Sequence, residues 1–112
     1  MLPSRRRPVR AVYGYFVRPS VLADAVLGKI GLVGRKDHAI LGEFRDKLFE
    51  QTGLDRSRFV ALEVSRDVGY CIVLKSNMKS IPPAPLQVVE KVKEYVAFLG
   101  DGPRWFRWRP YF

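Results

Sequence analysis

The sequence predicts an α+β fold built on an antiparallel sheet, with helices packed on one face of the sheet. Segments rich in β-branched and aromatic residues alternate along the chain with segments of helical apolar spacing. Two of the predicted strands are separated by so few residues that they should form a hairpin. With 112 residues and 47% hydrophobic content, the chain can close one core without a metal or a disulfide.

The first predicted strand spans residues 9–17, where the run Val-Arg-Ala-Val-Tyr-Gly-Tyr-Phe-Val is followed by Pro19. Ser20 is a suitable cap for a helix over residues 21–30, whose apolar residues keep helical spacing. Three glycines weaken and end this helix, and we interpret them as a flexible connection: Gly28, Gly31 and Gly34.

A second helix and a hairpin are predicted in the middle of the chain. Asp37 is an N-cap candidate for a helix that runs to about Gln51, and Gly53 supplies its stop. Strands are expected over residues 59–65 and 68–75, joined as an antiparallel hairpin. One face of the first of these strands is apolar: Val60, Leu62 and Val64.

The C-terminal part predicts a helix and a last strand. Three prolines lead into a helix over about residues 84–99, which Gly100 ends. Residues 106–109 then alternate and predict a short edge strand ended by Pro110. Two aromatic side chains share one face of this strand and two basic side chains share the other: Phe106 with Trp108, and Arg107 with Arg109.

The predicted order is therefore β-α-α-β-β-α-β, which resembles the ferredoxin-like split βαβ arrangement with one extra helix in its first crossover. We expect residues 9–112 to form a single α+β domain and residues 1–8 to form a basic N-terminal arm. In a common form of this arrangement the first and last strands are expected on separate flanks of the sheet, or together when the sheet curls. A fold of this kind implies no function by itself.

The net charge of +9 is concentrated at the two ends of the chain. Residues 1–36 carry eight Lys/Arg and one acid, whereas residues 37–103 carry nine Lys/Arg and ten acids. Residues 104–112 carry three arginines and no acid. A basic balance confined in this way is typical of a protein with an anionic partner.

Aromatic residues accompany the terminal arginines, and together they predict a nucleic-acid-binding surface. Arginine binds phosphates through paired hydrogen bonds, and flat rings stack on unpaired bases, so the combination suits RNA or single-stranded DNA. If the chain ends meet, the two basic ends become one patch. The candidate binding residues are Arg5, Arg6, Arg7, Arg10, Tyr13, Tyr15, Arg104, Trp105, Arg107, Trp108 and Arg109.

No residue pattern predicts catalysis, a cofactor or a metal site. The only histidine is His38, which sits beside Asp37 where a helix is expected to start. Cys71 is the only cysteine, so a multi-cysteine zinc site and an internal disulfide are excluded. Its apolar neighbours favour a small buried side chain over a nucleophile. We therefore expect a non-enzymatic protein with no cofactor.

Two alternatives to nucleic-acid binding stay open. The aromatic C-terminal tail is rich in residue types that dominate protein interfaces, so it could dock on a protein partner or on a second copy of the chain. A small-ligand protein or enzyme with a pocket between sheet and helices is the third reading.

The composition also gives expectations about location. No stretch is apolar enough to span a membrane, and the single cysteine favours a reducing, intracellular compartment. The Arg-rich start is also typical of an organelle transit peptide, although the strand predicted over residues 9–17 argues against cleavage there.

Overall fold

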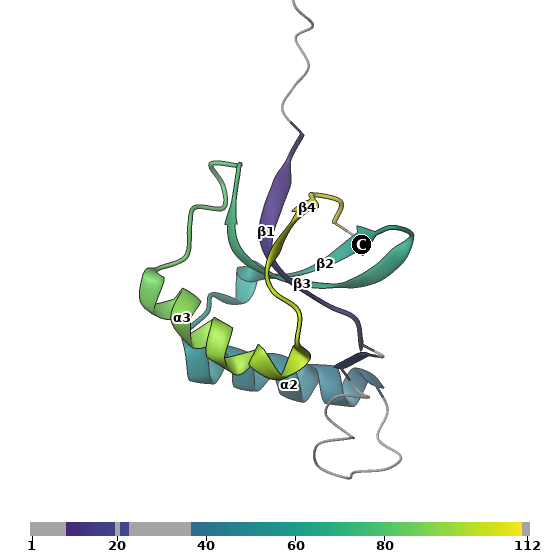
Figure 1. Cartoon of the computed structure of the whole chain (residues 1–112), viewed down its shortest axis with the longest axis vertical. Coiled ribbons are helices and arrows are strands. Elements are labelled where there is room, and N and C mark those ends of the chain that lie inside the picture. The colour runs from purple at the N-terminus through teal and green to yellow at the C-terminus, as the bar shows by residue number, and fades with distance from the viewer. Residues whose placement is uncertain (1–8, 20, 23–36, 111–112) are drawn as a thin grey trace, which may run out of the picture.

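The computed structural model of the chain describes residues 9–19, 21–22 and 37–110. Within them it has an α+β architecture with a four-stranded antiparallel sheet and two α-helices (Figure 1). The elements, in chain order, are β1 (Ala11–Val17), α2 (Asp37–Thr52), the 3-10 turn η1 (Arg56–Arg58), β2 (Phe59–Val64), β3 (Asp67–Ser76), α3 (Leu86–Tyr95), the 3-10 turn η2 (Ala97–Leu99) and β4 (Arg104–Arg107).

The strands lie in the order β2-β3-β1-β4, and every neighbouring pair is antiparallel. The predicted hairpin is confirmed, with Phe59 opposite Ile72 and Val64 opposite Asp67. Its turn consists of Ser65 and Arg66, one residue earlier than the two-residue link expected from the sequence. The predicted edge strand is present as β4, but it lies two residues earlier than the alternation over 106–109 indicated. It begins at Arg104, which pairs with Gly14 of β1, and it ends at Arg107, before Pro110.

Gly14 allows β1 and β3 to approach each other closely. The register of this pair shifts between Tyr13 and Gly14, so that Leu74 has no direct partner on β1. A Cβ atom on residue 14 would overlap the carbonyl oxygen of Ile72. Glycine is therefore the residue that this irregular pairing requires.

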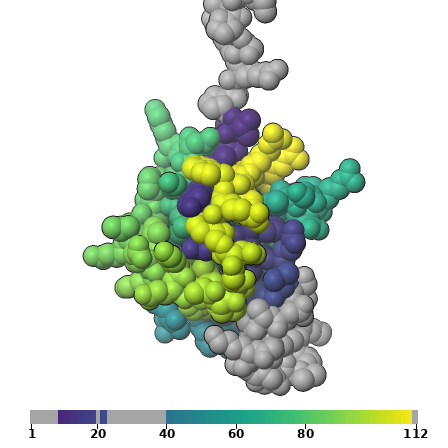
Figure 2. Space-filling model, in the orientation of Figure 1, coloured from purple at the N-terminus to yellow at the C-terminus, as the bar shows by residue number. Residues whose placement is uncertain are grey.

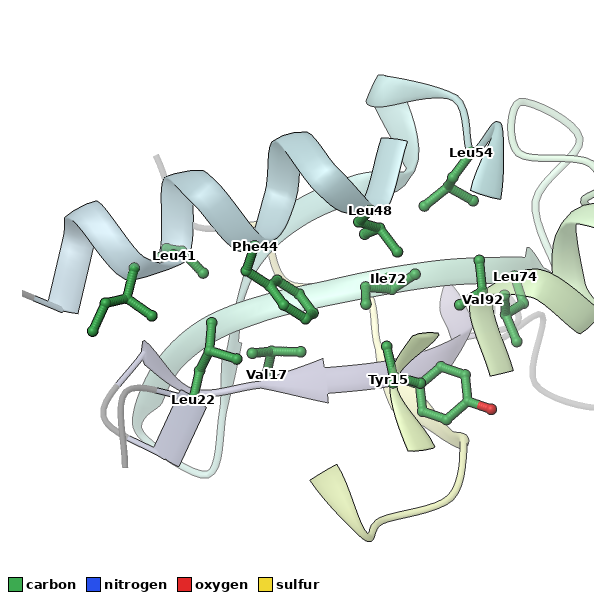
Figure 3. Close-up of a cluster of buried hydrophobic side chains, with 12 residues drawn as sticks. Tyr15, Val17, Leu22, Leu41, Phe44, Leu48, Leu54, Ile72, Leu74 and Val92 are labelled. Carbon is green, nitrogen blue, oxygen red and sulfur yellow. The ribbon is translucent and has the colours of Figure 1, made fainter. Parts of the chain in front are cut away.

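Both helices pack on the same face of the sheet and form its larger core (Figure 3). Helix α2 contributes Phe44 and Leu48, and α3 contributes Val92. They meet side chains of β1 and β3 such as Val17 and Ile72. Figure 1 shows α2 and α3 side by side below the strands.

The opposite face of the sheet holds a second, smaller core made of strand residues: Val12, Leu62, Cys71, Val73 and Phe106. No helix covers it. Instead the segment after β4 crosses to β2, where Pro110 forms a bridge with Leu62 and the N–H of Glu63 donates to the carbonyl of Arg109 at 3.0 Å. This crossing brings the two edges of the sheet together around the second core.

The helix ends differ from the sequence-based expectations in detail. Gly53, with φ of 74°, follows the last residue of α2 as predicted. The long helix expected over residues 84–99 is instead α3 and then η2, which ends at Gly100 with φ of 82°. Of the helix expected over 21–30, Val21 and Leu22 are described, and Leu22 is fully buried. The predicted glycine connection and the N-terminal arm lie outside the described residues. Among the residues that the structure describes, no helix is long and apolar enough to cross a membrane.

Candidate nucleic-acid interface

The pairing of β1 with β4 brings basic residues from the two ends of the chain together. Ala11 lies opposite Arg107, and the N–H of Trp108 donates to the carbonyl of Arg10 at 2.8 Å. Arg10 and Arg107 are both exposed, but Arg10 precedes Ala11, the partner of Arg107, so the two side chains leave opposite faces of the sheet. In Figure 2 the C-terminal segment, in yellow, lies on the surface beside the first strand, in purple. Arg5, Arg6 and Arg7 lie outside the described residues.

A row of three side chains crosses β3, β1 and β4, and we call it the aromatic row: Lys75, Tyr13 and Trp105. The three residues are direct neighbours in the sheet register. The rings of Tyr13 and Trp105 lie 5.3 Å apart, and the Nζ of Lys75 is 4.9 Å from the first ring and 5.8 Å from the second. Trp105 is nevertheless 52% exposed. The row thus offers a supported, half-open indole beside a cation.

Other predicted aromatic residues face inward. Tyr15 is 6% exposed within the larger core. Burial raises the pKa of its phenol most, and the nearby Tyr13 and Glu90 raise it further. Trp108 is half-buried against the second core. Alternation along β1 and β4 explains both positions, because every second side chain on a strand faces the same core. The ring of Tyr15 is therefore not available for stacking on a ligand.

A hollow of about 390 Å³ opens between the β2–β3 turn and the β4 segment, and we call it the basic hollow. Its lining residues come from two stretches of chain: Glu63, Val64, Ser65 and Arg66, and Trp105, Phe106, Arg107 and Arg109. Among the described residues, none of the three arginines is within ion-pair distance of a carboxylate. Their guanidinium groups are thus free to bind an anion.

Arg104 is exposed at the start of β4, outside the basic hollow. Its guanidinium carbon lies 5.7 Å from the ring centroid of Phe106, and this contact holds the side chain along the strand.

Arg66 is a member of the basic hollow that the sequence did not single out. It lies in the stretch of balanced charge, where an arginine looks like any solvated residue. The one local signal is that a two-residue turn between strands is occupied by Ser65 and Arg66 without a glycine.

Potential catalytic groups are sparse where the structure describes the chain. Cys71 is completely buried, and burial raises the pKa of its thiol to about 12, so the thiol stays protonated near neutral pH. The described part contains no cluster of three or more His, Cys, Asp or Glu that could hold a metal ion. His38 lies in the first turn of α2, and its side chain is outside the described part.

Comparison of the chain with protein-family models, with curated proteins and with solved structures finds no match.

Proposed function

We propose that this protein is a non-enzymatic basic module that binds single-stranded nucleic acid, RNA or DNA, along its β1–β4 side. The observation that carries the proposal is Trp105, which is half exposed although Tyr13 and Lys75 support it from one side. An indole held in this way offers a flat surface on which an unpaired base can stack.

The surrounding charges support the same ligand. Arg107 is on the same strand as Trp105, Arg10 lies across the sheet from the end of that strand, and Arg109 follows it. Arg107 shares its face of β4 with Trp105, so it is the arginine best placed to contact the phosphates of a strand whose base stacks on that indole. Binding through such contacts should weaken steeply with salt, because each neutralised phosphate releases counterions.

Because of the second core, we expect the ligand to bind at an edge of the sheet and not on the face opposite the helices. That face is filled by side chains of the chain itself, including Leu62 and Phe106, and the crossing segment that ends at Pro110 closes over it. Bases therefore have better access to the aromatic row and to the basic hollow.

The test is a titration of labelled single-stranded RNA and DNA, with duplex DNA as comparison, at low and at physiological salt. We expect binding to both single strands at low salt, weaker binding at higher salt, and a loss of about tenfold in affinity for Trp105→Ala, equivalent to one stacked base. Leu86→Ala is the matched control, because Leu86 is 74% exposed on α3 and should not affect binding. Absence of binding at low salt would reject the proposal.

Docking on a protein partner through the C-terminal tail has less support. Phe106 is buried in the second core, Trp108 packs against that core, and Pro110 bridges to Leu62. Residues 104–110 of the tail thereby pack against their own sheet. The feature that supports this alternative is the half-exposed side chain of Trp105.

We also infer that the sheet has the ferredoxin-like arrangement. In a split βαβ unit, a further strand lies between the two parallel strands of the unit. The order β2-β3-β1-β4 supports this, because β3 lies antiparallel between β1 and β2, and β1 lies antiparallel between β3 and β4.

A further inference from the structure

The turn between β2 and β3 has an unusual backbone for its residues. Ser65 and Arg66 have φ of 50° and 69°, in the left-handed region that glycine and asparagine occupy most readily. Two-residue turns of this kind join strands well and are usually formed by Asn-Gly. The chain therefore carries a charged side chain where a glycine would fit the backbone better.

This conformation sets Arg66 at the wall of the basic hollow, across from Arg107 and Arg109. The three arginines come from the two edges of the sheet, which the crossing at Leu62 and Pro110 holds together. With Glu63, they give the lining a formal charge of +2, three positive against one negative.

We propose that the basic hollow binds the terminal phosphate of a single-stranded nucleic acid, with Arg66 as a phosphate-binding residue; this inference rests on the proposed function. A terminal phosphate monoester carries about −1.5 to −2 charges near neutral pH. That charge balances a lining of +2 more closely than the single charge of an internal phosphodiester.

The basic hollow lies where the chain crosses from one edge of the sheet to the other. The N–H of Glu63 donates to the carbonyl of Arg109 and Pro110 bridges to Leu62, so Arg109 is held next to β2, beside the turn that carries Arg66. Trp105 belongs to the same lining and is half exposed, so the base next to the bound phosphate can stack on its indole.

The experiment compares oligonucleotides of about ten nucleotides that are identical except for a phosphate or a hydroxyl at one end, with the fluorescent label on the other. Both polarities are measured, one with a 5′-phosphate and one with a 3′-phosphate. We expect the intact protein to bind one phosphorylated form about tenfold more tightly than its hydroxyl counterpart, the effect of about one charge-assisted hydrogen bond. Arg66→Gly should remove this difference and keep binding of the hydroxyl form.

Ser65→Gly is the matched control, because it gives the same turn a glycine and leaves the charge in place. Both glycine variants should raise the melting temperature, so a loss of phosphate preference in Arg66→Gly alone cannot come from unfolding. Arg66→Gln is a second test, because it removes the positive charge but keeps a polar side chain with a Cβ atom, and it should likewise lose the phosphate preference.

Equal binding of phosphate and hydroxyl ends by the intact protein would overturn the inference and leave the proposed function standing. An equal loss for both ends in Arg66→Gly would also overturn it, because Arg66 would then be a general contact. No binding of any oligonucleotide at low salt would instead reject the proposed function.

Discussion

Cys71 illustrates how burial alone can set the chemistry of a residue. It lies in the second core, where burial raises the pKa of its thiol from 9.0 to about 12. Between those values the unfolded chain loses the proton while the folded chain keeps it, so the free energy of unfolding should fall as pH rises. For this one group the fall is at most about 1.4 kcal/mol per pH unit.

Urea unfolding at several pH values above 9 would measure this slope. In Cys71→Ala the decline should be shallower, although part of it should stay, because burial raises the pKa of Tyr15 and Tyr95 in the same direction. An identical slope in both proteins would contradict a buried, protonated thiol.

Thr52, the last residue of α2, is buried and uses its hydroxyl twice. Its Oγ1 donates to the carbonyl of Leu48 and accepts from the N–H of Leu54 at 3.2 Å. Thr52→Val keeps the shape but leaves that N–H without this partner, so we expect a loss of about 1–3 kcal/mol in the free energy of unfolding. Thr52→Ser keeps the hydroxyl and is the control; chemical denaturation should find it closer to wild type than the valine variant.

At the level of the strands and helices, local patterns in the sequence were enough to predict most of the elements. The hairpin follows from alternation in β2 and a short link, and the end of α2 follows from Gly53. The long helix over 84–99 was wrong in its extent. After Tyr95 the backbone changes to a 3-10 turn, a change that the apolar spacing of the segment does not reveal.

The candidate site was less predictable, because it depends on contacts between distant segments. Tyr13 and Tyr15 share one face of β1, but Tyr15 is buried in the core under the helices, whereas Tyr13 is half-buried and packs against that core from outside. Arg66 joins Arg107 and Arg109 because the curled sheet brings the hairpin turn to the tail. Nothing in the residues around Arg66 encodes that approach.

For the molecule as a whole, the C-terminal segment should act as part of the fold. Phe106 is 9% exposed in the second core, whereas its neighbour Trp105 is half exposed. Phe106→Ala should lower the free energy of unfolding by about 3 kcal/mol or more, and Trp105→Ala by about 1 kcal/mol. Thermal melts followed by circular dichroism would compare them.

Deletion of residues 104–112 removes β4 and the bridge to Leu62 together, so we expect the cooperative melting transition to disappear. A shortened chain that still melts cooperatively would show that the fold does not need the tail, and would favour docking of the tail on a protein partner.

The pairing of β1 with β4 also has a consequence for how the chain reaches its folded state. The strand that contains Ala11 is synthesised well before its partner that contains Arg107. Contacts between such distant segments close large loops, and folding slows as they become more important. Until β4 leaves the ribosome, one edge of β1 is unpaired and can mispair with other chains.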